Sequence, residues 1–148
     1  MSTDESVTKD IIQTLEDGKD GFTKAAEKLD DLKEPQLVAQ FRQFAQQRTT
    51  FADELQQMAK AYGDHIDKSG SVAAALHRGW MSLKDAVTKS DSKAILEVAK
   101  QGEDHAVTEY EKALGEDISG DLRLVLERQF VQVKATRDMV AALVPSAT

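Results

Sequence analysis

Apolar residues recur every three or four positions along most of the chain, which is the spacing of one face of an α-helix. The pattern divides into four long segments, with a shorter one between the second and the third. We predict helices over residues 4–32, 35–62, 71–88, 91–114 and 119–143. Runs of alternating β-branched residues are missing from the sequence, so we expect no sheet.

Several predicted helices have recognisable ends. Ser2–Glu5 has the form of a capping box before the first helix, and Pro35 suits the first position of the second. Gly63 and Gly115 are natural stops for the helices that precede them. Because the turn between the first two helices is short, we expect these helices to form an antiparallel hairpin.

The shorter segment at 71–88 decides the topology. A helix of that length spans about 25 Å, enough to carry the chain back along the bundle, so that helices 35–62 and 91–114 run parallel. One long crossover of this kind is the ferritin-like arrangement. We therefore predict an all-α, ferritin-like four-helix bundle with a short crossover helix, forming one domain over 1–148. The alternative is a five-helix up-and-down bundle with the short helix inside the core.

A polar layer is predicted at the middle of this bundle. Glu103 lies on the inward face of its helix, and a buried charge needs a partner. Arg48 is the one charge on the apolar stripe of the second helix. Gln129 and Gly18 fall on the inward faces of the last and first helices. We predict an Arg48–Glu103 ion pair supported by Gln129. Gly18, Gly21 and Gly102 would make room for the guanidinium.

This layer occupies the place where ferritin-like proteins hold two metal ions. Those proteins use a Glu-x-x-His pair on each of two helices, and no Glu or Asp in this chain is followed by His three residues later. A guanidinium stays protonated and binds no metal. We expect no cofactor and a structural layer. Two alternatives stay open: a small anionic ligand held by Arg48, and an iron or manganese site built from acidic residues, the candidates being Glu103 with Glu16, Asp17, Asp20 or Glu127.

The stretch from Gly70 to Met81 is the most distinctive part of the sequence and holds the one tryptophan. One interpretation is that Trp80 attaches the crossover helix to the bundle. The other is a partner surface, since Trp, Met and Arg are typical of protein interfaces. That surface would consist of His77, Arg78, Trp80 and Met81.

Composition narrows the class of protein. The chain has no cysteine, which excludes disulfides and thiol catalysis, and no nucleophile elbow or phosphate-binding glycine loop is present. The net charge of -7 argues against nucleic acid. The acidic N-terminus is unlike a signal peptide, and no apolar run reaches the length of a membrane span. We expect a cytoplasmic protein that binds neither nucleic acid nor membrane.

Several phrases spread over the chain resemble a known bacterial family. They are Glu16-Asp17-Gly18, Phe51-Ala52-Asp53-Glu54-Leu55, Gly70-Ser71-Val72 through Trp80-Met81, Gly102-Glu103-Asp104 and Glu127-Arg128-Gln129. The chain is similar to uncharacterised four-helix-bundle proteins of the ferritin-like group, a domain of unknown function. The resemblance implies a ferritin-like fold and supplies no reaction or catalytic residue. We expect a non-enzymatic, stress-related or accessory protein that acts by self-association or by binding a protein partner.

Overall fold

The computed structural model describes residues 3–60, 79–80, 82–89 and 91–144. Its helices are α1 (Thr3–Asp31), α2 (Pro35–Lys60), α4 (Leu83–Thr88), α5 (Ser92–Leu114) and α6 (Gly120–Leu143). These residues contain no strand. The predicted all-α bundle is confirmed.

The helix ends are fixed by polar side chains. The Asp91 carboxylate accepts a hydrogen bond from the backbone N–H of Lys93, at 3.0 Å, where α5 begins. The Ser119 hydroxyl accepts from the backbone N–H of Leu122, at 3.3 Å, where α6 begins. Each bond satisfies a donor that the first turn of a helix leaves unpaired. The Asp4 carboxylate accepts from the backbone N–H of Ser119, at 2.8 Å, and so joins the starts of α1 and α6.

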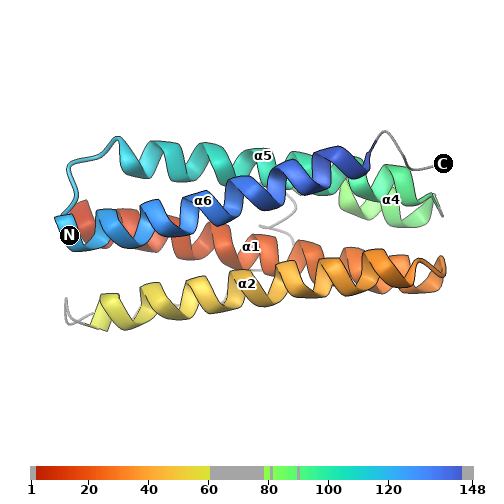
Figure 1. Ribbon diagram of the computed structural model, residues 1–148, viewed down its shortest axis with the longest axis horizontal. Coiled ribbons are helices and arrows are strands. Elements are labelled where there is room, and N and C mark those ends of the chain that lie inside the picture. The colour runs from red at the N-terminus through yellow and green to blue at the C-terminus, as the bar shows by residue number, and fades with distance from the viewer. Residues whose placement is uncertain (1–2, 61–78, 81, 90, 145–148) are drawn as a thin grey trace.

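The four long helices form two antiparallel hairpins, α1 with α2 and α5 with α6 (Figure 1). Buried apolar residues gather in two clusters. The first joins the N-terminal halves of α1 and α6 to the C-terminal halves of α2 and α5. The second joins the opposite halves and includes α4. Helices α2 and α5 therefore run in the same direction and lie on a diagonal of the bundle.

The connection from α2 to α5 begins at one end of the bundle and reaches α4 at the other end (Figure 1). A single long connection between parallel helices is the crossover that the sequence predicts. One continuous helix over 71–88 is not what forms, since Gly79, Trp80 and Ser82 are non-helical. Gly79 has φ of 101°, a left-handed conformation that glycine adopts without steric cost. Residues 71–78 and 81 lie outside the described part of the chain.

Candidate functional site

An ion pair between α2 and α5 lies where the two apolar clusters meet. The Arg48 guanidinium donates from Nη1 to Glu103 Oε1 at 2.6 Å and from Nη2 to Glu103 Oε2 at 2.7 Å. Both side chains are buried, with exposed fractions of 1% and 0%. Two parallel bonds between a planar guanidinium and a carboxylate are the strongest arrangement that this pair of groups can adopt.

The other two helices complete the surroundings of Arg48. Its Nε donates to Gln47 Oε1 at 3.1 Å, and the same oxygen accepts from the Thr136 hydroxyl of α6 at 3.4 Å. A Cβ on Gly18 of α1 would lie 3.4 Å from Arg48 Nη1. The Phe22 ring lies 5.5 Å from the guanidinium carbon, within range of a cation–π contact. All four long helices thus contact the guanidinium or its hydrogen-bond partners, and each of its three nitrogens is bonded.

Gln129 does not support this pair, contrary to the sequence prediction. Its side chain forms a second polar group, in which it accepts from the Tyr110 hydroxyl at 2.7 Å. It donates to Glu54 Oε1 at 2.8 Å and to the Phe51 carbonyl at 3.3 Å. Thr136 is the α6 residue at the height of the ion pair, and Gln129 lies two turns, about 10 Å, earlier in α6.

Tyr110 is the ionisable side chain of that second group. Burial raises the pKa of its hydroxyl well above the ordinary value, and the nearby Arg48 guanidinium opposes that shift only in part. The hydroxyl therefore remains a neutral donor to Gln129. The apolar repeat of its helix predicts an inward position for Tyr110 but does not indicate a polar role.

Trp80 is a buried residue rather than a surface one, with an exposed fraction of 2%. Its indole lies between α1 and α5, against two glycines. A Cβ on Gly21 or on Gly102 would come well under 3.0 Å from the indole ring. These two glycines make room for Trp80, not for Arg48 as the sequence suggested. The predicted partner surface is therefore wrong for Trp80, while His77, Arg78 and Met81 lie outside the described residues.

The acidic candidates for a metal site do not converge on one point in the described part of the chain. Glu16 forms an ion pair with Lys19 at 3.1 Å, and Glu103 is held by Arg48. Glu127 is exposed on α6. Burial raises the pKa of Asp20, which disfavours the charged form that a cation needs. In the described ranges no three His, Asp or Glu side chains form a group that could hold a metal ion. The donor set does not fit the di-metal centre of ferritin-like proteins.

Asp17 is the remaining acidic candidate on α1. It is buried and accepts a hydrogen bond from Gln13 Nε2 at 3.4 Å.

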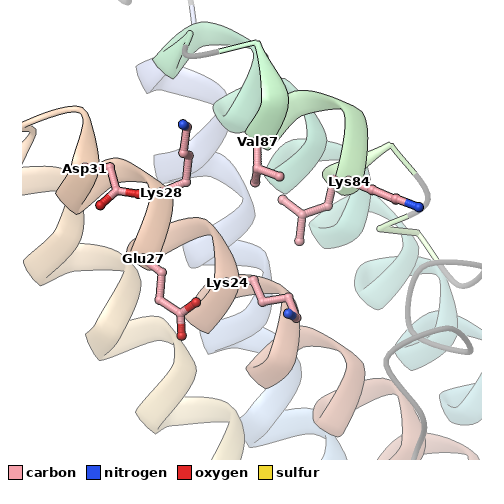
Figure 2. A pocket seen from close by; sticks show the side chains of 7 residues that line it. Lys24, Glu27, Lys28, Asp31, Lys84 and Val87 are labelled. Carbon is pink, nitrogen blue, oxygen red and sulfur yellow. The ribbon is translucent and has the colours of Figure 1, made fainter.

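A groove of about 440 Å³ lies between the C-terminal half of α1 and α4, away from the ion pair. Val87 points from α4 toward α1, and the Glu27 carboxylate points away from α4 (Figure 2). Among the described residues, the lining mixes both signs of charge with two aliphatic side chains. The lining residues are Lys24, Glu27, Lys28, Asp31, Leu83, Lys84 and Val87.

Comparison with known proteins identifies the family. Residues 5–116, three quarters of the chain, match the model of a domain of unknown function, DUF2383. The chain belongs to this family of uncharacterised domains. No curated protein matches the sequence at a significant level. None of the described helices combines the length and the apolar character needed to span a membrane.

Proposed function

We propose that this chain is a non-enzymatic, ferritin-like helical bundle that acts by associating with itself or with a protein partner. The observation that carries the proposal is the buried Arg48–Glu103 pair at mid-bundle. A guanidinium occupies the place where a cation would otherwise neutralise the inward carboxylate. The centre of the bundle then fixes the register of the helices, and the outer faces of the bundle bind the partner.

The ferritin-like assignment rests on topology. Two antiparallel hairpins joined by one long crossover are the arrangement of that group, and the pairing of α1 with α2 and of α5 with α6 supports the assignment. Fold likeness alone assigns no activity. A small anionic ligand at Arg48 is not favoured by the contacts, because all three guanidinium nitrogens already donate to protein oxygens.

The proposal also includes a cellular compartment, a class of partner that is disfavoured and a domain organisation. An acidic chain with a net charge of -7 suits the cytoplasm and disfavours nucleic-acid partners. We assign residues 1–148 to a single domain, because the two apolar clusters each draw on all four long helices. A bacterial source and a stress-related role rest on the resemblance in sequence alone.

Metal titration tests the proposal. Tag-free protein is titrated anaerobically with Fe(II) and with Mn(II), and washed samples are analysed for retained metal. We expect retention far below one ion per chain. Retention near one or two ions per chain that is lost in Glu103→Gln, but kept in Glu97→Gln, a control at an exposed position of the same helix, would overturn the proposal and establish a carboxylate metal site. Circular dichroism of each variant shows whether it remains folded.

A further inference from the structure

Helix α6 carries apolar residues on its outer face as well as its inner one. Leu124 and Val131 are 67% and 61% exposed, and Met139 is 47% exposed. Leu124 and Val131 share one outward face with the exposed Ala135 and Ala142. Leu124 and Ala142 are 18 residues apart, which is five full turns, so the face runs straight along about 27 Å of helix. No other large apolar side chain in the described residues is comparably exposed.

The spacing along this face is that of a coiled-coil seam. Its positions follow alternating steps of four and three residues, the repeat that packs one helix along another. They are Leu124, Arg128, Val131, Ala135, Asp138 and Ala142. All six are exposed, including the two charged residues. The inner residues of α6, among them Leu126 and Val133, belong to the bundle core. Within the described part of the chain, no other helix covers the seam, since all six of its residues are exposed.

We infer that this seam is a docking surface for the same helix of a second copy of the chain, in antiparallel orientation. The inference deepens the proposed function by naming its partner. The two-fold axis crosses the interface at the level of Val133 along the helix. Each seam residue of one copy then lies opposite one seam residue of the other copy, and each such pair forms a layer. Leu124 then opposes Ala142 of the other copy, and Val131 opposes Ala135, so each large side chain meets a small one.

Charge decides the orientation. In the antiparallel register, Arg128 of one copy shares a layer with Asp138 of the other, and symmetry repeats the pair. In a parallel register, Arg128 would face Arg128 and Asp138 would face Asp138, which is repulsive. Within the monomer these residues bond to Glu54 and Arg137 and remain 57% and 70% exposed, so a partner can still reach both.

The affinity should be modest. A stable interface buries about 1,600 Å² in total, and one helix pair in which every apolar layer contains an alanine supplies less than that. We therefore expect a dimer that dissociates on dilution. The family match ends at residue 116, before α6 begins, and so does not bear on this face.

Sedimentation velocity of the full chain over a hundredfold concentration range tests the inference. The wild-type chain should shift from monomer to dimer, and Val131→Glu should stay monomeric because it places two carboxylates at the dimer centre. The matched control Gln101→Glu, exposed on α5, should behave as wild type. Circular dichroism checks that each variant is folded.

Charge exchange tests the register. Arg128→Glu and Asp138→Arg should each weaken the dimer, and an equimolar mixture of these two variants should restore it as a heterodimer. A dimer that Val131→Glu leaves intact would overturn the α6 surface while retaining self-association. A wild-type chain that is monomeric throughout would overturn the inference, and metal titration would still decide the proposed function separately.

Discussion

A single carboxylate accounts for the chemistry at the centre of this bundle. Glu103 is fully buried and can remain charged because Arg48 supplies two hydrogen bonds and a full positive charge. The sequence led to these two residues because each is the one charge on an otherwise apolar stripe. It did not reveal Gln47 and Thr136, which complete the layer. Both are neutral polar residues, and nothing in their spacing distinguishes them from a solvated helix face.

The height of Gln129 along the bundle axis could not be predicted from helical periodicity. Its inward face follows from the helical repeat, but its height does not, because the helices begin at different levels of the bundle. An error of two turns placed it beside Arg48 instead of beside Tyr110. Height is set by how the connections align the helices, and the sequence pattern of one helix carries no such information.

Alkaline pH should destabilise the protein through Tyr110. Burial raises the pKa of this hydroxyl in the folded state, so the folded protein resists an ionisation that the unfolded chain undergoes near pH 10. The contribution to stability is intact below that pH and declines above it, by up to about 1.4 kcal/mol per pH unit. Urea unfolding between pH 8 and 11 measures this decline.

Tyr110→Phe is the variant that isolates this effect. It should lower stability at pH 8 by about 1–3 kcal/mol, because Gln129 Oε1 loses its donor. The free energy of unfolding of this variant should also decline less steeply above pH 10 than that of the wild type. An alkaline slope identical to that of wild type would show that other groups cause the decline.

At the scale of elements, the crossover is held by an aromatic side chain and two small residues. Trp80 packs edge-to-face on Phe22, with ring centroids 5.1 Å apart, and Gly21 and Gly102 leave the space that its indole fills. A glycine costs about 1 kcal/mol relative to alanine in a helix interior, which indicates that something bulky approaches. The apolar pattern does not identify that group, and we had assigned the space to Arg48.

Gly102→Ala should therefore destabilise the protein despite its better helix propensity. Propensity favours alanine by about 1 kcal/mol, while the indole displacement that the new Cβ forces costs about 1–3 kcal/mol or more. We expect a net loss in urea unfolding and a red shift in the fluorescence of Trp80, the one tryptophan.

Two comparisons make the Gly102 experiment decisive. Gly120→Ala, where a Cβ would meet open space, should be neutral or stabilising. In a Trp80→Ala background, Gly102→Ala should no longer destabilise, because the clashing ring is gone. If the cost persisted in that background, the packing of Trp80 on Gly102 would not be its cause.

At the scale of the whole molecule, hydrophobic patterning was enough to predict an all-α bundle with a crossover. Amphipathic stripes of helical period and short hairpin turns leave few other architectures. The form of the crossover was harder to predict, because an apolar pattern over 71–88 continues through Gly79 and Trp80, where the described chain is non-helical. The tertiary contacts of Trp80 outweigh local helix propensity there.

The ion pair also joins the two halves of the molecule. It lies between the two apolar clusters and connects α2 to α5 across a diagonal. A buried pair adds little net stability compared with apolar replacements, because both charges lose their hydration. Replacing only one of the two charged residues lowers stability strongly, because the remaining charge stays buried without a partner.

The most direct test of this account compares the free energies of urea unfolding of Arg48→Met, Glu103→Leu and the double variant. Each single variant should lose about 3–5 kcal/mol, and the double variant should recover most of that loss. Arg42→Met, an exposed position on the same helix, should change stability by less than about 0.5 kcal/mol. A near-neutral Arg48→Met, or a double variant as unstable as the sum of the singles, would contradict a buried pair that closes the centre of the bundle.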